Sequence, residues 1–226
     1  MKETIADFLA ISSGSVVAVI GCGGKTSLIA LIAEGSTGEK VLISTTTKMF
    51  PPAHALREGV ECVGVLNPAS GKLEALSEPA LAGMMPRYAI VLLEADGSRG
   101  LSCKGWLANE PVIPGVCTHT VGVVTMDALG KAATKAVVHR LPEFLSLTGL
   151  REGEIITEQA LKRMVCAPAG MFKNSVGRRF LLVNQVEGDA AARAARSFLR
   201  AVKEEYPDRF ERLLYGSVHL DTWQEV

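Results

Sequence analysis

A glycine-rich turn between two apolar stretches most constrains how this chain can fold. Val16 to Ile20 is a continuous apolar run, which is typical of a strand buried on both faces. From Leu28 to Ile32, apolar residues repeat at helical spacing. Between them lies Gly21-Cys-Gly-Gly-Lys-Thr26, whose glycines let backbone N–H groups approach an anion closely. The helix that begins near Lys25 points its unpaired N–H groups at the same place, so the sequence predicts a nucleotide phosphate site.

The side chains that follow the glycines suit such a site. Lys25 would bring a positive charge to the phosphates, and the Thr26 hydroxyl would be a ligand of Mg²⁺. The usual phosphate-binding loop begins with a glycine where this chain has Val19, so the loop is a short variant. A turn that only connects a strand to a helix is the alternative. The residues expected to surround the phosphates are Gly21, Cys22, Gly23, Gly24, Lys25, Thr26 and Ser27.

Length and composition favour one α/β domain. A chain of 226 residues can bury a sizeable core. Its 24 basic and 24 acidic residues create no overall field that would recruit nucleic acid or an anionic membrane. No apolar run reaches the roughly 20 residues of a membrane span, and the first residues lack the form of a secretory signal, so we expect a cytoplasmic protein. Five cysteines without a Cys-x-x-Cys pair argue against a disulfide framework and a structural zinc site.

Apolar runs that alternate with amphipathic runs predict the fold class. They imply an α/β protein with a doubly wound, mainly parallel sheet of the P-loop NTPase type and a helical elaboration in the second half. The single domain 1–226 would contain a long loop at 97–118 and a mainly helical elaboration at 138–178. The expected strands are Val16–Ile20, Val41–Thr45, Cys62–Leu66, Ala89–Glu94, Thr120–Thr125, Phe180–Asn184 and Leu213–Val218. The expected helices are Thr4–Ala10, Lys25–Ala33, Pro79–Met84, Glu143–Leu147, Glu158–Val165 and Ala190–Glu205.

The helix at Ala190–Glu205 has the clearest pattern. Asp189 is its expected N-cap, and Pro207 prevents much continuation. Its expected core face consists of Ala191, Ala195, Phe198 and Val202. Because ligands of doubly wound sheets bind beyond the carboxyl ends of the strands, residues at those ends are the functional candidates.

The second expected strand ends in hydroxyls and a cation. Ser44-Thr-Thr-Thr-Lys48 would deliver them to the same sheet edge as the phosphates. One or two of the threonines are candidates to hold Mg²⁺ directly or through water, Thr46 is a candidate cofactor-binding residue, and Lys48 is a candidate to meet a phosphate. A β-branched strand terminus followed by a solvated lysine is the alternative.

A sharper signal follows the strand at Ala89–Glu94. Glu94 stands at the tip of this apolar run, and Asp96 follows two residues later in a glycine-containing loop. This is the Walker B arrangement, in which a carboxylate holds Mg²⁺ or its water shell. We expect Lys25, Glu94 and Asp96 to be the catalytic residues, with Asp96 facing the metal and Glu94 orienting water, although the sequence leaves the division open. An acidic turn without a metal is the alternative.

The fourth polar strand end is Asn184-Gln-Val-Glu187. It lies where many nucleotide-binding α/β proteins carry a base-reading Asn-Lys-x-Asp, with Gln185 and Glu187 replacing the lysine and the aspartate. Asn184 can hydrogen-bond a purine edge, and Glu187 can accept from the N1 and N2 donors of guanine. The two replacements leave the choice between adenine and guanine open.

Together these motifs resemble the YqeC family. The resemblance runs from about Gly14 to Asn184, and its most specific block is Glu94 to Pro114. It implies a P-loop nucleotide-binding protein that helps to install or mature a selenium-containing cofactor of molybdenum hydroxylases. The matching residues are Gly21-x-Gly-Gly-Lys-Thr, Thr45-Thr46-Thr47-Lys48, Glu94-Ala-Asp-Gly-Ser-Arg-Gly100, Lys104, Glu110-Pro-Val-Ile-Pro114, His139-Arg140 and Asn184.

Several positions depart from the family pattern. The family usually has glycine in place of Cys22, and Cys103 and Trp106 interrupt what is commonly Leu-Lys-x-Pro. Thiolates are soft ligands suited to selenium, but a family that lacks these cysteines does not need them for its common chemistry. Arg99 and Lys104 are expected to sense the terminal phosphate or to bind an acidic cofactor such as a pterin phosphate. Solvated loop cations are the alternative.

The sequence therefore predicts a protein that binds ATP or GTP with Mg²⁺ and hydrolyses it slowly, or only with its client present. The client implied by the resemblance is a selenium-dependent molybdenum hydroxylase or its cofactor. One alternative is a non-catalytic, nucleotide-gated carrier or chaperone. A weaker one is a Mur-like ATP-dependent ligase, for whose separate domains the chain lacks room.

Overall fold

The computed structural model describes residues 3–52 and 54–226, and its centre is an eight-stranded sheet. The strand order across the sheet is β13-β12-β11-β9-β1-β7-β2-β4. Every neighbouring pair is parallel except β12 and β13, which pair antiparallel at one edge. The strands are β1 (Ser15–Gly21), β2 (Val41–Thr45), β4 (Val60–Cys62), β7 (Ile90–Glu94), β9 (His119–Thr125), β11 (Arg178–Asn184), β12 (Arg212–Ser217) and β13 (Thr222–Glu225).

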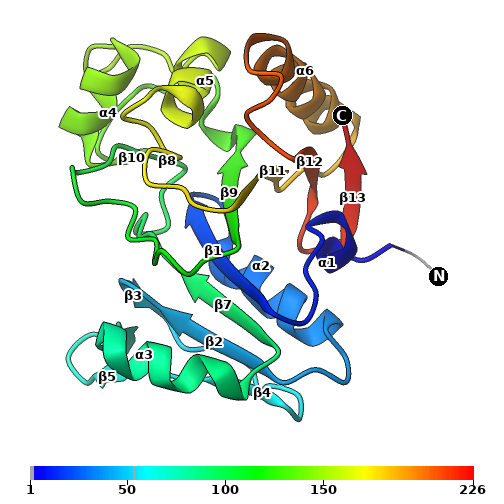
Figure 1. Ribbon diagram of the computed structural model, residues 1–226. Helices are drawn as coiled ribbons and strands as arrows, with labels where there is room; N and C mark the ends of the chain where they lie inside the picture. Colours follow the sequence, from blue (N-terminus) through cyan, green and yellow to red (C-terminus); the bar gives the residue numbers. More distant parts are fainter. Residues whose placement is uncertain (1–2, 53) are drawn as a thin grey trace.

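Helices cover both faces of this sheet (Figure 1). Two helices, α1 (Ile5–Phe8) and α2 (Lys25–Gly35), contribute to the core on one face. The other face is covered by α3 (Glu78–Met84), α4 (Leu141–Thr148), α5 (Glu158–Cys166) and α6 (Asp189–Glu205). The protein is thus an α/β protein with the doubly wound, P-loop NTPase-like sheet that the sequence predicts.

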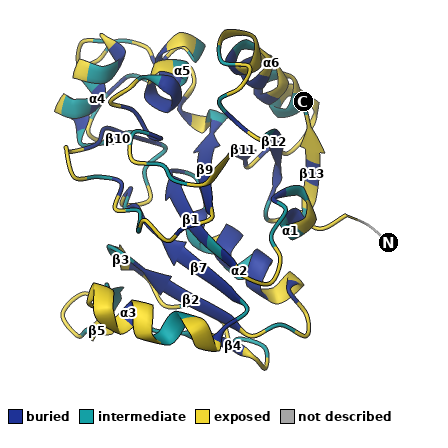
Figure 2. Ribbon diagram, in the orientation of Figure 1, coloured by how far each residue is buried: buried dark blue, intermediate teal, exposed yellow. Residues whose placement is uncertain are grey.

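Burial along the strands explains the two cores. In β1, Val17 and Val19 pack on the α2 side, whereas Ala18 and Ile20 pack on the α6 side, because successive side chains of a strand point to opposite faces. The inner strands are accordingly buried, whereas the edge strand β13 and the outer surfaces of the helices are largely exposed (Figure 2). This accounts for the continuous apolar runs in the sequence.

Two small sheets lie outside the main one. The first contains β3 (Lys48–Met49), β6 (Lys72–Glu74) and β5 (Val65–Asn67), and the second pairs β8 (Cys103–Lys104) with β10 (Val138–His139). Two short 3₁₀ turns, η1 (Met85–Arg87) and η2 (Met126–Ala128), complete the elements.

The expectation of a single strand at Cys62–Leu66 was wrong. The chain leaves the main sheet after Cys62 and enters the small sheet at Val65. Gly64 lies at the crossing, where a Cβ would stand 2.9 Å from the Leu73 Cβ and 3.0 Å from the Glu74 carbonyl oxygen. A glycine permits this close approach of two segments.

The expected start of α6 also needs a correction. Gly188, with φ of 85°, is the N-cap, and Asp189 is the first helical residue. Gly188 makes no side-chain cap, so Asp189 contributes by placing its negative charge in the first turn. The face predicted for this helix is confirmed: Ala195, Phe198 and Val202 are buried, and Ala191 packs against them in part.

The five cysteines are free thiols, four of them buried and Cys62 half-buried. Within residues 3–52 and 54–226, no helix is both long enough and apolar enough to cross a membrane.

The connections of the central strands indicate which edge of the sheet is suited to bind a ligand. From β1 the chain crosses to β2 on one side of β1, and from β9 it crosses to β11 on the other side. The carboxyl ends of β1 and β9 are therefore neighbours whose following segments diverge, and such a point is the usual ligand crevice of an open α/β sheet.

Candidate functional site

The glycine loop between β1 and α2 has a conformation that only glycine adopts easily. Gly21, Gly23 and Gly24 have φ angles of 93°, 95° and 109°. A Cβ on Gly21 would overlap the Val123 carbonyl oxygen. A Cβ on Gly24 would stand 2.5 Å from the side-chain nitrogen Nδ2 of Asn184. The glycines are thus required both by backbone conformation and by close packing.

Part of the loop is used to fix its own shape. The Gly21 amide donates to Asp96 Oδ2 at 3.1 Å, and the Cys22 amide donates to the Val123 carbonyl at 2.8 Å. The first amide that makes a helical bond in α2 is that of Leu28, which donates to the Gly24 carbonyl.

The amides of Gly23 to Ser27 have no acceptor among the residues that the structure describes. They form a consecutive row at the amino end of α2, where the helix dipole is positive. Such a row is suited to surround an anion such as a phosphate. Of the expected phosphate residues, Gly21 and Cys22 shape the loop, whereas Gly23 to Ser27 supply the free donors.

Lys25 lies folded against the loop. Its ammonium group donates to the Gly21 carbonyl at 2.9 Å and to Ser98 Oγ at 3.4 Å. Glu94 Oε1 lies 4.0 Å from the same nitrogen, and the lysine is only 5% exposed. The positive charge is therefore held at the mouth of the row of amides, close to the carboxylate at the end of β7.

Thr26 and Glu94 are joined directly. The Thr26 hydroxyl donates to Glu94 Oε2 at 2.6 Å. Burial raises the pKa of Glu94, while Lys25 and Thr26 favour its charged form. One hydroxyl oxygen and one carboxylate oxygen beside free amides fit the preferences of Mg²⁺, which takes few protein ligands and keeps phosphate and water oxygens. No cluster of three or more His, Cys, Asp or Glu side chains that could hold a metal occurs in the described ranges.

Asp96 is engaged in a different way. Its Oδ1 is paired with Lys104, and its Oδ2 accepts from Trp106 Nε1 at 2.7 Å as well as from the Gly21 amide. Both oxygens are thus used inside the protein, and the residue is 1% exposed. In this geometry Glu94 faces Thr26, and Asp96 anchors the loop, whereas the sequence had favoured Asp96 for the metal.

Lys104 is fully buried rather than solvated. Besides Asp96, its ammonium group donates to the Gly97 carbonyl at 2.7 Å and lies 3.3 Å from Glu110 Oε2. The other oxygen of Glu110 pairs with Arg140 at 2.8 Å. A chain of charges therefore runs from the glycine loop to the start of α4.

Three other expected site residues lie apart from the row of amides or make other contacts. The Thr46 amide donates to the Glu94 carbonyl at 3.1 Å, but its hydroxyl donates to the Val112 carbonyl at 2.6 Å. Lys48 is exposed and pairs with Glu74 at 2.7 Å in the small sheet. Arg99 is exposed and has a φ of 53°, in the turn that follows Asp96.

Asn184 braces the loop from the end of β11. Its Nδ2 donates to the Gly23 carbonyl at 2.7 Å, and its Oδ1 accepts from the Val218 amide at 2.9 Å. Both ends of the amide are thus used, and the side chain is 3% exposed. The residue holds the glycine loop and the end of β12 together.

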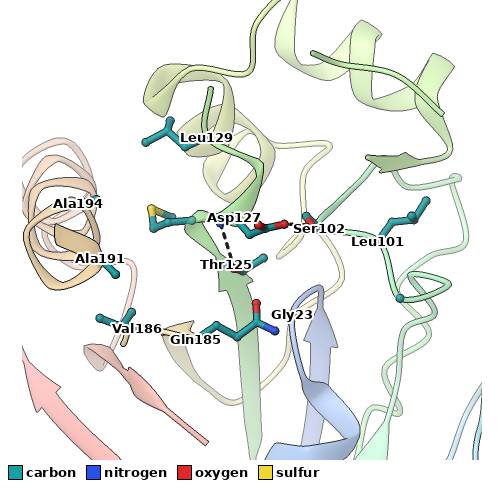
Figure 3. A pocket seen from close by; sticks show the side chains of 12 residues that line it. Gly23, Leu101, Ser102, Thr125, Asp127, Leu129, Gln185, Val186, Ala191 and Ala194 are labelled. Carbon is teal, nitrogen blue, oxygen red and sulfur yellow. Dashed lines mark hydrogen bonds between the residues drawn. The ribbon is translucent and has the colours of Figure 1, made fainter. Parts of the chain in front are cut away.

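A cleft of about 660 Å³ opens beside Gly23, between the loop that follows β7 and the start of α6 (Figure 3). Apolar side chains form much of its wall, and Ser102 donates to Asp127 at 2.7 Å within the lining. Its size is that of a small-molecule site. Sequence reasoning missed this cleft, although Asp127 closely follows the strand at Thr120–Thr125 and was a signal. The lining residues are Gly23, Gly100, Leu101, Ser102, Thr125, Met126, Asp127, Leu129, Gln185, Val186, Ala191 and Ala194.

The two cysteines near the site are protected. Burial raises the pKa of the Cys22 thiol to about 12 and also raises that of Cys103. Both side chains are fully buried. Their thiols therefore stay protonated and behave as small core residues.

Comparisons with known proteins agree on one family. A family model described as YqeC protein matches residues 17–142. A protein of Escherichia coli strain K12 named "Uncharacterized protein YqeC" is 33% identical over 181 residues, which is 71% of this chain and 71% of that protein. No solved structure matches.

Proposed function

We propose that this chain, which belongs to the YqeC family, binds a purine nucleoside triphosphate together with Mg²⁺ and hydrolyses it slowly. Hydrolysis of the triphosphate would serve the maturation of a selenium-dependent molybdenum hydroxylase or of the cofactor of that enzyme. The client is proposed from the family membership, and the nucleotide is proposed from the glycine loop.

The observation that carries the proposal is the row of free amides from Gly23 to Ser27. Apart from Lys25, the row is half-buried to exposed, so an anion can reach it, and its consecutive N–H groups at the start of α2 have no acceptor among the described residues. Lys25 adds a positive charge at the same place, held by the Gly21 carbonyl. Phosphate groups supply both the negative charge and the acceptor oxygens that these groups need.

Thr26 and Glu94 suit the metal that accompanies a triphosphate. The hydroxyl would become a direct ligand, and the carboxylate would hold the ion or its water. When bound, Mg²⁺ would neutralise charge that develops on the phosphate oxygens during hydrolysis. The protein's own part is to hold the terminal phosphate with the loop amides and to orient water with Glu94.

Slow hydrolysis is expected because the cations near the site already pair with protein groups. Lys104 is used by Asp96 and Glu110, and among the described residues no arginine side chain contacts Lys25, Thr26 or Glu94. Rapid phosphoryl transfer in this class relies on such a cation to stabilise the transition state. A client that supplied one would accelerate hydrolysis.

The cleft beside Gly23 favours a second component. Because Gly23 belongs both to the cleft and to the phosphate loop, a ligand in the cleft would contact the nucleotide site. This supports nucleotide-driven delivery or activation of a small molecule. The nucleotide-gated carrier is the alternative, and it differs only in releasing no phosphate.

Thermal unfolding with and without nucleotide tests the proposal. Millimolar ATP or GTP with Mg²⁺ should raise the Tm of the wild type, because a ligand that binds only the folded state stabilises it. Lys25→Met should lose this shift, whereas Lys135→Met, which removes an exposed lysine elsewhere, should keep it. An unchanged shift in Lys25→Met would refute the phosphate site. Phosphate release with and without a molybdenum hydroxylase then separates hydrolysis from the carrier.

A further inference from the structure

We infer that the nucleotide of this site is a guanine nucleotide, and that Glu187 reads its base. The inference rests on the proposed function, because it assigns the base of the same bound triphosphate. It names a residue outside the phosphate loop and decides between the two purines.

The first step is the position of the segment that follows β11. Asn184 holds the Gly23 carbonyl with one end of its amide and the Val218 amide with the other. Gly23 begins the row of free amides, so the ends of β11 and β12 are both fixed beside the phosphate site. Glu187 lies three residues beyond Asn184 and can be at most about 10 Å away along the chain. The ribose of a nucleotide held at Gly23 can bridge that distance.

The second step is the geometry of Glu187 itself. The Ser217 hydroxyl donates to its Oε1 at 2.9 Å. Ser217 is 1% exposed, and its oxygen also accepts from the Leu220 amide at 3.2 Å, which fixes the hydroxyl. Glu187 is exposed, and its Oε2 has no partner among the described residues. The carboxylate is thus held at one oxygen by the end of β12 and leaves the other oxygen free to accept from a ligand.

The third step is the backbone between these residues. Gln185 has a φ of 63°, a left-handed conformation that costs a residue with a Cβ about 1 kcal/mol or more. The Val186 amide donates to the Gly216 carbonyl at 2.9 Å, so the turn is fixed to β12. Figure 3 shows the Gln185 side chain extending toward the glycine loop. Strain of this kind is typical of ligand-binding turns.

Hydrogen-bond chemistry then selects the base. Guanine presents two adjacent donors, N1–H and the N2 amino group, to a facing carboxylate. Adenine presents a lone pair at N1 and a C–H at the neighbouring carbon, so a carboxylate there would be repelled and left without a partner. A site built for such donors rejects an analogue that lacks them far more strongly than a merely apolar pocket would.

Glu187→Gln, which replaces the carboxylate with a carboxamide, tests the inference because the variant should bind a different base. In Glu187→Gln the new NH₂ group can donate to the carbonyl at position 2 of xanthine, where guanine carries its amino group. Calorimetric titration with GTP, ATP and XTP, each with Mg²⁺, should show that the wild type prefers GTP by about tenfold or more. Glu187→Gln should lose that preference and bind XTP more tightly than GTP. Ser217→Ala, which releases the carboxylate and also removes the acceptor of the Leu220 amide, should weaken GTP binding without favouring XTP.

The control and the contrary outcomes separate the two proposals. Asp189→Asn removes a nearby exposed carboxylate at the start of α6 and should leave the GTP preference intact. Equal affinity of the wild type for ATP and GTP, or a retained GTP preference in a folded Glu187→Gln, would overturn the base assignment and leave the phosphate site standing. A wild type that binds none of the three triphosphates would refute the proposed function and this inference with it.

Discussion

Thr26 in the first turn of α2 donates a hydrogen bond to Glu94 at the end of β7. The bond joins α2, the helix that follows β1, to the end of β7, the strand next to β1 in the sheet. Glu94 is buried at this junction, and burial raises the pKa of its carboxyl group. The protein therefore retains a charge that destabilises its folded state, which is common where the charge is needed for function.

Glu94→Gln should raise the stability of the protein and abolish its response to Mg²⁺. The folded state binds the Glu94 proton more tightly than the unfolded state does, so this group's contribution to stability falls as pH rises through and above its ordinary pKa of 4.5. The variant should thus be more stable than the wild type at pH 8, with a gain that shrinks toward pH 4.5. Urea unfolding across that range measures this. Glu204→Gln, at an exposed carboxylate of α6, should show no such trend. A Glu94→Gln protein that still responds to Mg²⁺ in nucleotide titrations would contradict the assigned role.

Gly21→Ala should destabilise the protein much more than Gly14→Ala. The two glycines have nearly the same φ, 93° and 90°, so the conformational cost of about 1–2 kcal/mol is shared. Only at Gly21 would the new Cβ meet the Val123 backbone, whereas Gly14 has open space. Denaturant unfolding should therefore show a loss at Gly21 that exceeds the loss at Gly14 by at least about 1 kcal/mol. Equal losses would mean that the loop can shift away from β9.

Asp96→Ala should lower the free energy of unfolding. It leaves the fully buried Lys104 without its closest partner, and removal of one member of a buried ion pair typically costs about 3–5 kcal/mol. Asp96→Ala combined with Lys104→Met should recover part of that loss, because no buried charge then remains unpaired. Urea unfolding of the single and double variants tests this. If the double variant loses the sum of the two single losses, the pair is not coupled.

Thiol accessibility should follow burial. Ellman's reagent at pH 8 should modify Cys62 slowly in the native protein, because this thiol is half-buried and its pKa is raised to about 11. Cys22 should react only after unfolding. Mass spectrometry of the modified peptides identifies the reacted residue. Rapid native labelling of Cys22 would instead indicate an open glycine loop and a reactive thiol.

The strands of the central sheet could be predicted because burial on both faces produces continuous apolar runs. Val41–Thr45 matches β2 at both ends, and Phe180–Asn184 lies inside β11. The edge strand β13 was missed, since its only buried side chain is Trp223 and the rest is exposed. A short, one-sided strand gives no apolar run. The turn of the chain at Gly64 was missed for the opposite reason, because apolar residues continue across it.

The candidate site could be predicted in position but not in its internal partnerships. The glycine loop, Glu94, Asp96 and Asn184 do gather at one edge of the sheet, as the strand ends imply. Their individual contacts depend on residues far away in the sequence. Lys104 illustrates the limit: a loop lysine is usually solvated, and only the folded chain brings Asp96 and Glu110 together to bury it. Binding of nucleotide and Mg²⁺ by these residues stays a prediction.

The bond from Asn184 to Gly23 joins residues 161 positions apart, and Val218, which donates to Asn184, lies another 34 positions along the chain. During synthesis, the glycine loop leaves the ribosome long before these braces exist. Closure of so large a loop is slow and costly in chain entropy, so the phosphate site should take its final shape late in folding. A chain truncated before β11 would carry the complete glycine motif and still lack Asn184, the side chain that braces Gly23.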